Sequence, residues 1–195
     1  MIRIEWTHEG LTYIAIEASI EDVRTHADAL ALAYNDPKNA SLLGHDEPHT
    51  ADDVVDHYAD LLAEGGRAFL LFHDGKLDGD SDLRDIHDNI AEFAIMIGAP
   101  DAQGKGLGTR YAIMIHAFGF QRAGLSRIYS SIVAHNVGSR RMFDKLGYQV
   151  DDSAAARAHA EEPDDIVLVI DRATFERLHA STLAQLKITT AAGFQ

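Results

Sequence analysis

Glycines at alternate positions mark a short segment in the middle of the chain, Gln103-Gly104-Lys105-Gly106-Leu107-Gly108-Thr109. Because glycine carries no Cβ, the backbone N–H groups of such a segment stay accessible to a ligand. An apolar run at 90–97 precedes the segment, and apolar residues follow it with helical spacing over about 105–122. The positive end of that helix dipole would point at the same place. The segment therefore predicts a strand, a loop and a helix arranged around a phosphate-bearing ligand.

Two common phosphate-binding motifs do not fit this loop. A P-loop needs Ser or Thr after its Gly-Lys pair, but Gly106 follows Lys105. The dinucleotide fingerprint needs a third glycine, and Tyr111 occupies that position when the count starts at Gly106. Counting from Gly104 places Thr109 there instead. Both kinds of nucleotide site are therefore excluded, and the pattern that does fit is Gln-x-x-Gly-x-Gly.

The spacing of apolar residues predicts an α/β (α+β) fold, with one mixed sheet flanked by helices. We expect strands at 2–6, 11–16, 68–72, 90–97, 128–133 and 166–170. Helices are expected to begin at Ser19 and Thr50 and to cover 105–122, 136–146 and 173–186. Asp22 and Asp53 stand three residues after Ser19 and Thr50, which is the spacing of a capping box.

Two segments between these elements show no apolar period. We expect a loop at 38–49 and a wide hairpin or solvated loop at 76–89, where aspartates are frequent. No Pro-, Gly- or Ser-rich linker divides the chain, and 46% of its 195 residues are hydrophobic, which suffices for one full-sized core. We therefore expect a single domain over 1–195.

The charge balance limits the partners of the chain. It has 17 Lys and Arg against 31 Asp and Glu, a formal net charge of −14, which disfavours nucleic acid and anionic membranes. No apolar run approaches the length of a membrane span, and the N-terminus lacks the apolar core of a signal peptide. A cytoplasmic protein is therefore expected. Cysteine is absent, which excludes disulfides, thiolate catalysis and Cys-based zinc sites.

A second motif follows the glycine loop, after the strand expected at 128–133. It reads Asn136-Val137-Gly138-Ser139-Arg140-Arg141-Met142-Phe143-Asp144-Lys145-Leu146-Gly147-Tyr148. Together with Gln103-x-x-Gly106-x-Gly108, it resembles the two signatures of the GCN5-related N-acetyltransferase (GNAT) family, in the family's order. The likeness is clear over about 90–150, and the chain looks most like the branch that acetylates ribosomal-protein N-termini and polyamines. It implies a single GNAT-like domain with a mixed, mostly antiparallel sheet.

The resemblance implies acetyl-CoA as co-substrate, no metal, and direct transfer of the acetyl group to an amine. In the family the glycine loop binds the pyrophosphate. Here that motif opens with Gln103 and continues with the backbone N–H groups of Gly104, Lys105, Gly106, Leu107, Gly108 and Thr109. The pantetheine arm would pair with Ile95, Met96 and Ile97, and one of these N–H groups would polarise the thioester carbonyl.

The same resemblance adds residues of the second motif to the cofactor site: Asn136, Ser139, Arg140 and Phe143. Asn136 would contact the pantetheine, Ser139 has the small size needed near the thiol, and Arg140 could reach the nucleotide phosphate. Each has an ordinary alternative. Asn136 is equally suited to cap a helix, and Ser139 and Arg140 to lie on a helix surface.

Acyl transfer to an amine needs a base, because an alkyl ammonium has a pKa of about 10. Glu92 is the one acidic residue inside the apolar run 90–97. A carboxylate there is costly unless it is solvated, paired or used in catalysis. We therefore predict Glu92 as the catalytic base, acting directly or through water. The alternative is an exposed residue at a strand end, since a one-residue shift in register would turn Glu92 to the other face.

One residue departs from the family pattern. Phe143 occupies the position where the family often has a tyrosine that protonates the leaving thiolate. Tyr148 and Tyr111 are available substitutes, although no motif supports them. A thiol pKa of about 8.5 also allows the thiolate to leave unaided or to be protonated by water. The departure motivates an alternative function, a non-catalytic module that binds acyl-CoA as a regulator.

The sequence leaves the acceptor and the assembly open. The aspartates at 74–88 favour a cationic amine, either a small molecule or a protein N-terminus, although a solvated hairpin explains them as well. His45 and His49 have the spacing of a ligand pair, but Pro48 disrupts the helix that would align them. No metal site is therefore expected. The length of the acyl group and the choice between monomer and homodimer stay open.

Overall fold

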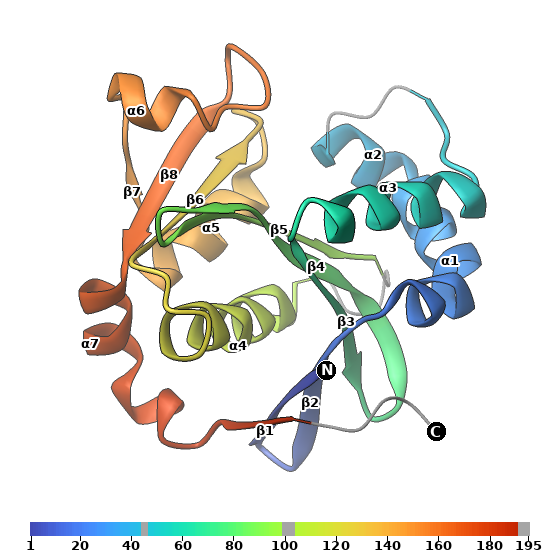
Figure 1. Ribbon diagram of the computed structural model, residues 1–195, viewed down its shortest axis with the longest axis horizontal. Helices are drawn as coiled ribbons and strands as arrows, with labels where there is room; N and C mark the ends of the chain where they lie inside the picture. The colour runs from blue at the N-terminus through green and yellow to red at the C-terminus, as the bar shows by residue number, and fades with distance from the viewer. Residues whose placement is uncertain (44–46, 99–103, 191–195) are drawn as a thin grey trace.

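A sheet of nine strands runs through the residues described by the computed structural model, 1–43, 47–98 and 104–190 (Figure 1). The strands are β1 (Ile2–His8), β2 (Leu11–Glu17), β3 (Arg67–His73), β4 (Lys76–His87), β5 (Ile90–Ile97), β6 (Arg127–Ile132), β7 (Gln149–Val150), β8 (Ile166–Asp171) and β9 (Lys187–Thr190). Their order across the sheet is β7-β8-β6-β5-β4-β3-β2-β1-β9. Neighbours are antiparallel except β5 and β6, which are parallel. The prediction of a mixed, mostly antiparallel sheet is confirmed.

Helices cover both faces of this sheet. They are α1 (Ile20–Tyr34), α2 (Pro37–Leu43), α3 (Ala51–Ala63), α4 (Leu107–Gln121), α5 (Val137–Leu146), α6 (Ala154–Arg157) and α7 (Arg172–Leu183). In Figure 1, α1, α2 and α3 form one group, and α4 lies apart from them. Residues of α1 and α3 pack in one buried cluster with Leu70 and Met96, whereas α4 packs with Phe69, Leu83 and Phe93 in another. Successive residues of the strands therefore serve opposite faces, as the pleat requires.

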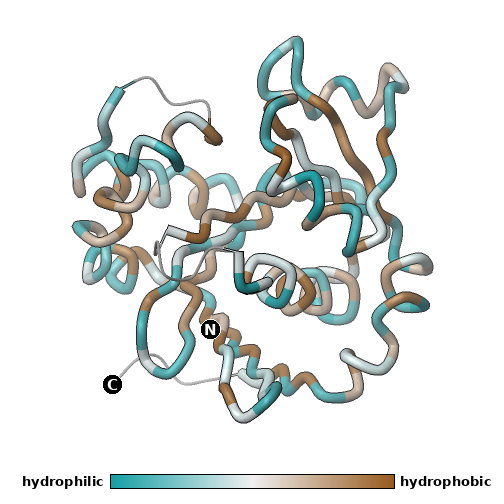
Figure 2. The backbone as a smooth tube through the Cα atoms, turned by 180° about the vertical axis from the view of Figure 1, so that it is seen from behind, coloured by the Kyte–Doolittle hydropathy of each residue, from teal (hydrophilic) through white to brown (hydrophobic). Residues whose placement is uncertain are grey.

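Helix α4 lies at the centre of the larger cluster, and hydrophobic residues also concentrate in the central strands (Figure 2). Eleven of the residues of α4 are buried. One of them is His116, whose Nε2 lies 2.6 Å from the Tyr148 hydroxyl, and burial lowers the pKa of His116 to about 3. Even so, no helix in the described part of the chain is both long and apolar enough to cross a bilayer.

Helix ends follow local signals in the sequence. Ser19 with Asp22, and Thr50 with Asp53, form the two predicted capping boxes at the starts of α1 and α3. Gly147 ends α5 in the left-handed conformation, with a φ of 99°. A side chain at that φ would be strained, which explains glycine there. These signals depend on neighbours within a few residues, so the sequence alone could place them.

The loop predicted at 38–49 is wrong in part, and of the two alternatives at 76–89 the hairpin agrees with the structure, whereas the solvated loop is wrong. Helix α2 begins at Pro37, because proline suits the first helical position, where no N–H is needed. Strand β4 covers 12 residues. The aspartates that indicated solvation lie inside this strand, and Asp78, Asp80 and Asp82 are each at most 3% exposed. Elements β7, β9 and α6 lie outside the predicted set, since two to four residues carry little periodicity.

Candidate active site

The parallel strands β5 and β6 separate in the middle of the sheet. They pair at three positions, the last of which joins Glu92 to Tyr129, although β5 continues to Ile97 and β6 to Ile132. At the point of separation, the Ser130 hydroxyl donates a hydrogen bond to the carbonyl of Phe93, over 3.0 Å. Beyond it, the two described strands face each other across a gap. An extended ligand could pair with a strand edge of this kind.

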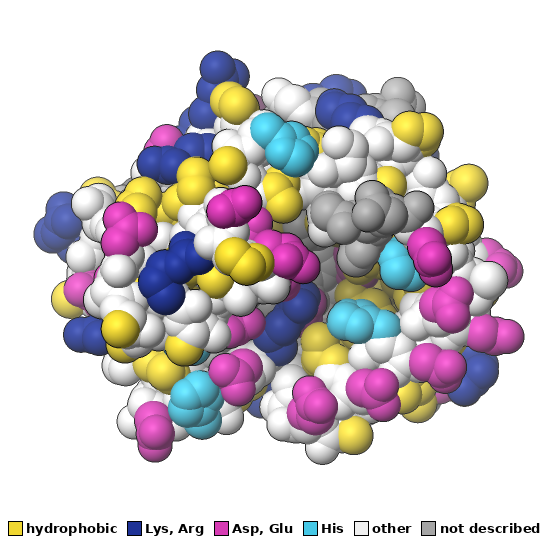
Figure 3. Space-filling view, turned by 90° about the horizontal axis from the view of Figure 1, so that it is seen from above, with side chains coloured by type: hydrophobic (Ala, Val, Ile, Leu, Met, Phe, Trp, Pro, Cys, Tyr) yellow, Lys and Arg dark blue, Asp and Glu magenta, His cyan; other side chains and the backbone are white. Residues whose placement is uncertain are grey.

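A cavity of about 330 Å³ occupies the gap. Six predicted site residues line it: Glu92, Ile95, Met96, Asn136, Ser139 and Phe143. Of the other predicted site residues that the structure describes, Ile97, residues 104–109 and Arg140 do not line it. The space-filling view shows the molecule hollowed between two lobes, with acidic side chains on both sides of the hollow (Figure 3). The structure thus brings together residues from both sequence motifs.

The glycine loop leads directly into α4. Gly104 and Gly106 both have left-handed φ values, 76° and 77°. Gly106 is the N-cap of α4 and provides no side-chain hydrogen bond to the first turn. The backbone N–H groups of the first turn of α4 therefore keep their capacity to bind an anion. Gln103, the first residue of the motif, lies outside the described residues.

The loop also packs closely against the second motif. A Cβ at Gly108 would lie 3.1 Å from the Met142 Sδ in α5 and 3.7 Å from the Ile97 Cγ1. This close approach explains why glycine occupies the position. Ile97 therefore connects the end of β5 to the loop, although it lies outside the cavity. Arg140, on the exposed side of α5, places its Nε 3.7 Å from the Asp144 Oδ1.

Sequence reasoning missed one cation beside the loop. The Arg110 Nη1 donates to the Lys105 carbonyl over 2.9 Å, and the guanidinium lies 5.2 Å from the centre of the Tyr13 ring. A Cβ at Gly106 would be 3.2 Å from the same Nη1. Arg110 therefore adds positive charge to the helix N-terminus, where phosphate groups bind. Its place one helical turn after Gly106 is the signal that could have identified it.

Asn136 caps α5, which confirms one of its two predicted roles. Its Oδ1 accepts a hydrogen bond from the Ser139 N–H over 3.0 Å. Its Nδ2 donates to the Leu42 carbonyl over 3.2 Å. Asn136 thus links α5 to the end of α2, across the mouth of the gap between β5 and β6. A contact with pantetheine remains a prediction.

Phe143 is buried on the wall of the cavity. Its ring meets the rings of Phe93 and Tyr148 edge-on, with centroids 6.2 Å and 4.8 Å away. The two tyrosines suggested as substitute acids have hydroxyls engaged elsewhere. Tyr148 contacts His116, and the Tyr111 hydroxyl donates to Asp78 over 2.5 Å. Neither tyrosine lines the cavity, so the structure gives no support to either as a proton donor.

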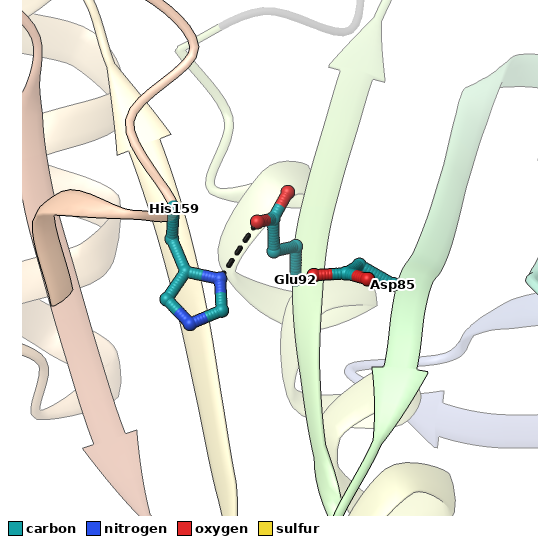
Figure 4. A group of neighbouring side chains, drawn as sticks. All are labelled: Asp85, Glu92 and His159. Carbon is teal, nitrogen blue, oxygen red and sulfur yellow. Dashed lines mark hydrogen bonds and ion pairs between the residues drawn. The ribbon is translucent and has the colours of Figure 1, made fainter. Parts of the chain in front are cut away.

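Glu92 lines the cavity at the last position where β5 pairs with β6. The His159 Nδ1 lies 2.7 Å from the Glu92 Oε1 (Figure 4). The His159 ring in turn stacks on Tyr129, with centroids 4.2 Å apart and an interplanar angle of 13°. This packing fixes the ring and, through it, one carboxylate oxygen. No local pattern in the sequence indicates this contact, because 67 residues separate the two side chains.

Asp85 joins Glu92 and His159 in a group that could hold a metal ion (Figure 4). Their ligand atoms lie within 4.8 Å of one another, and Asp85 is exposed. Glu92 and His159 already satisfy each other, so we interpret the group as a hydrogen-bonded pair with a carboxylate nearby. His45, half of the histidine pair in the sequence, lies outside the described residues.

The other end of the cavity is acidic. The lining of the whole cavity includes six carboxylates: Glu92 on β5, and outside β5 and β6 the side chains of Asp53, Asp80, Asp82, Glu161 and Asp165. Arg84 is the one Lys or Arg in the described lining. Its Nε and Nη2 donate to Asp82 over 2.7 and 2.9 Å, and its Nη1 lies 3.4 Å from Glu161. The excess of carboxylates attracts cations to this end.

Asp80 is the most buried of these carboxylates, with 1% exposure. Its Oδ2 accepts hydrogen bonds from the hydroxyls of Tyr34 in α1, over 2.7 Å, and Tyr58 in α3. Burial raises the pKa of Asp80 to about 6, although the two hydrogen bonds act in the opposite direction. Burial, together with the charge of Asp80, also raises the pKa of both tyrosines.

Comparison with known proteins agrees with this geometry. Residues 20–149 match the family model described as acetyltransferase (GNAT) domain. The match covers most of the chain, including both motifs and the separated strands. This protein belongs to the GNAT acetyltransferase family, as the two motifs predicted.

Three relatives illustrate the likeness. Spermidine N(1)-acetyltransferase of Escherichia coli (strain K12) is 32% identical over 121 residues, which are 58% of this chain and 63% of that protein. The chain thus covers less than two thirds of that relative. The structure of an uncharacterized protein from Bacillus halodurans matches with a TM-score of 0.75 and 15% identity, over 93% of this chain and 96% of that one.

A third relative is the spermidine N-acetyltransferase from Vibrio cholerae, whose structure was solved in complex with CoA and spermine. It matches with a TM-score of 0.67 and 20% identity, over 84% of this chain and 97% of that chain. At such identities, the likeness between structures concerns the fold alone.

Proposed function

We propose that this protein transfers an acetyl group from acetyl-CoA to a cationic amine. The observation that carries the proposal is the single cavity with two different ends. One end lies between the separated strands β5 and β6, and the other is lined by α1, α3, β4 and residues 161–165, which together carry five of the six carboxylates of the cavity. A thioester arm fits the first end, and a cation is attracted to the second. Family membership supports the donor, and the spermidine acetyltransferases among the relatives support the acceptor.

The donor end works through the backbone. The N–H groups at the start of α4, with Arg110 beside them, bind the diphosphate. The pantetheine arm pairs with the edge of β5 at Ile95–Ile97, and one N–H of that edge polarises the thioester carbonyl. Asn136, Ser139 and Phe143 form part of the facing wall. Arg140 contributes charge from outside the cavity.

Glu92 serves as the base in this proposal. Its carboxylate takes a proton from the ammonium group through water, and the free amine then attacks the carbonyl carbon. The C–S bond breaks, and the second proton of the attacking nitrogen goes to the thiolate or to solvent. The hydrogen bond to His159 holds the carboxylate in place. Glu92 lines the cavity, and the hydrogen bond to His159 fixes its orientation. Both observations support this role.

The charge of the chain supports the rest of the proposal. A formal net charge of −14 suits a cytoplasmic enzyme without a nucleic-acid or membrane partner. The described residues leave both a monomer and a homodimer compatible with the site. The acceptor is either a small amine or a protein N-terminus.

A steady-state assay of thiol release from acetyl-CoA tests the function. The panel consists of small monoamines, diamines, amino sugars and peptides with free N-termini, at neutral pH. We expect at least one cationic acceptor to accelerate thiol release well above the rate of hydrolysis. A mass increase of one acetyl group on the acceptor confirms the product.

The same assay decides between this function and a regulatory module that only binds acyl-CoA. Phe143 favours that second function, because it provides no proton for the thiolate. Tight binding of acetyl-CoA with no acceleration by any amine would establish the regulatory module. A thermal shift with ATP or NAD but not with CoA would contradict both functions.

A further inference from the structure

The six carboxylates of the cavity differ in what holds them. Five have a cap, cation or hydroxyl partner: Asp53 with Thr50, Asp82 and Glu161 with Arg84, Glu92 with His159, and Asp165 with Ser131. Asp80 differs because its partners are two neutral phenols, both on Oδ2. Its Oδ1 is buried and accepts no hydrogen bond from the described residues. Asp80 thus lacks a counter-ion and has an unused acceptor.

A carboxylate in this condition costs free energy unless something compensates it. Burying an ion away from water is unfavourable, and an unpaired acceptor adds to the penalty. Arg84 acts on Asp80 only through the charge of its guanidinium and compensates it in part, because the guanidinium is bound to Asp82 through two nitrogens. The missing partner is therefore a group with positive charge and several N–H donors. A ligand ammonium has both properties.

The surroundings of Asp80 suit such a group. The Tyr34 and Tyr58 hydroxyls donate to Asp80, so both rings lie beside the carboxylate. Aromatic rings also attract cations through their faces. Both tyrosines and Asp80 line the cavity that Glu92 lines. The three side chains come from α1, α3 and β4, so the fold brings them together.

The register of the sheet places Asp80 away from the proposed base. Asp80 lies opposite Met96, and Arg84 lies opposite Glu92. Alternate residues share a face, so Asp80 and Glu92 lie on the same face, roughly 13 Å apart along the strands. Ala94, with its small side chain, lies midway between them. A thioester bound at the edge of β5 would therefore have one carboxylate on each side, each roughly 7 Å away along the strands.

We propose that Asp80, Tyr34 and Tyr58 form a subsite for a second, non-reacting ammonium group of the acceptor. The proposal rests on the proposed acetyl transfer and narrows the acceptor to a short diamine or polyamine. One amine reacts near Ala94 and loses its proton towards Glu92. The other stays protonated on Asp80, and this contact selects the substrate. Asp80 is thus a specificity residue and takes no part in the proton transfer.

Asp80→Asn tests the subsite with a matched pair of acceptors. Putrescine carries the second ammonium, and n-pentylamine replaces it by a methyl group at nearly the same length. In the wild type we expect kcat/KM for putrescine to exceed that for n-pentylamine by at least about thirty-fold, as expected for one charge-assisted contact. In Asp80→Asn the preference falls below about three-fold through a higher KM for putrescine, while n-pentylamine keeps its kcat/KM.

Asp56→Asn is the control for long-range charge. Asp56 is an exposed residue of α3 outside the cavity, so its substitution removes the same charge without touching the subsite. We expect it to keep the wild-type preference. Thermal unfolding and CoA affinity of Asp80→Asn show whether the fold is intact. An equal loss with both amines, or an unchanged preference, would overturn the proposal.

Calorimetry separates this proposal from the proposed function. Putrescine is titrated into the CoA-loaded wild type and both variants. If the wild type acetylates neither amine but binds putrescine, and Asp80→Asn alone loses that binding, the transfer activity fails and the subsite stands. If the wild type acetylates n-pentylamine as well as putrescine, the activity stands and the subsite fails. Absence of putrescine binding to the wild type also overturns the subsite.

Discussion

The two ends of the cavity are built from different parts of the chain. At the donor end, the groups that we propose to bind the ligand are backbone N–H groups of β5 and of the start of α4. At the acceptor end, they are side chains from α1, α3, β4 and the segment at 161–165. The donor end therefore depends on local backbone geometry, and the acceptor end depends on tertiary packing.

This difference explains how one fold can keep its donor and change its acceptor. A backbone site needs small residues and correct φ values, which few substitutions preserve. A side-chain site changes whenever one carboxylate or tyrosine is replaced. Variants at the donor end should therefore abolish activity with every amine. Variants at the acceptor end should change which amine is used.

Gly106→Asp should have the largest effect. The new carboxylate would lie beside the bound diphosphate and would pair with Arg110, whose Nη1 is 3.2 Å from the Cβ position. Two unit charges 4 Å apart at an effective dielectric of 20 repel by about 4 kcal/mol. We therefore expect CoA affinity to fall about a thousand-fold, measured by calorimetry.

Gly124→Asp is the control for backbone strain. Gly124 has the same φ as Gly106, 77°, and a Cβ there would meet nothing within 4 Å. It should cost similar stability and leave CoA affinity unchanged. Equal affinity in the wild type and Gly106→Asp would contradict the assignment of the loop.

Glu92→Gln tests the base that lies between the two ends. We expect kcat/KM to fall about a hundred-fold near neutral pH, because general-base catalysis contributes that order. The rate should recover as the pH approaches the pKa of the amine, about 10, since more free amine is then present. The pH–rate profile of each variant measures this.

Glu161→Gln provides the comparison for Glu92. It removes another lining carboxylate, and burial raises the pKa of Glu161 in the wild type. If Glu92 is the base, Glu161→Gln keeps the shape of the wild-type profile. A Glu92→Gln profile parallel to that of the wild type removes Glu92 from the mechanism.

Asp80→Asn should stabilise the protein at neutral pH, although it damages the subsite. The pKa of Asp80 is raised from 3.8 to about 6, so the folded state binds the proton more tightly than the unfolded state. Its contribution to stability is fully present below pH 3.8 and is lost as the pH rises through about 6. At pH 7 we expect the variant to gain about 2 kcal/mol in the free energy of unfolding in urea.

Several groups facing Asp80 enter this prediction: Tyr34 from α1, Tyr58 from α3, and Asp82 and Arg84 on its own strand. The tyrosine hydroxyls can donate to the amide oxygen of Asn, so their hydrogen bonds persist. Asp82→Asn should have the opposite effect, because it removes the buried partner of Arg84. If Asp80→Asn and Asp82→Asn both lower the free energy of unfolding at neutral pH, burial does not destabilise the ionised form of Asp80.

The donor end was largely predictable from the sequence. Gly106 and Gly108 mark the loop that begins α4, and Asn136 caps α5. Each of these residues lies within a few residues of the structure that it predicts. The family resemblance added the strand segment Ile95, Met96 and Ile97 as the place where pantetheine would pair. Arg110 was missed, although its place one helical turn after Gly106 is a local signal of the same kind.

The acceptor end was not predictable in the same way. Tyr34 and Tyr58 lie 46 and 22 residues from Asp80, and only the packing of α1 and α3 on the sheet joins them. The alternation of Asp78, Asp80 and Asp82 was consistent with a strand. The frequent aspartates leave a hairpin and a solvated loop equally open, because charged residues are rarely buried without partners. The partners of Asp80 and Asp82 were invisible until the fold was known.

Phe143→Tyr should have the smallest effect on activity. It tests whether the donor end lacks a proton donor for the leaving thiolate. Phe143 is 2% exposed and lines the cavity, so a hydroxyl on its ring can reach the region of the thioester. A thiol with a pKa of about 8.5 is already a good leaving group near neutral pH. We therefore expect kcat to rise by less than about three-fold. The added acid assists departure of the thiolate, and that step contributes little to the limit on kcat.

A rise well above that limit would mean that thiolate departure controls the rate in the wild type. The donor end would then lack a proton donor that catalysis needs. Of the two ends, the acceptor end would be the one with all its functional groups in place. Phe93→Tyr serves as the control, because Phe93 packs against Phe143 and also lines the cavity. A hydroxyl there tests whether any added phenol in this cluster raises kcat. If kcat rises in Phe143→Tyr and not in Phe93→Tyr, the effect depends on the position of the hydroxyl. The wild-type donor end then lacks a proton donor for the thiolate.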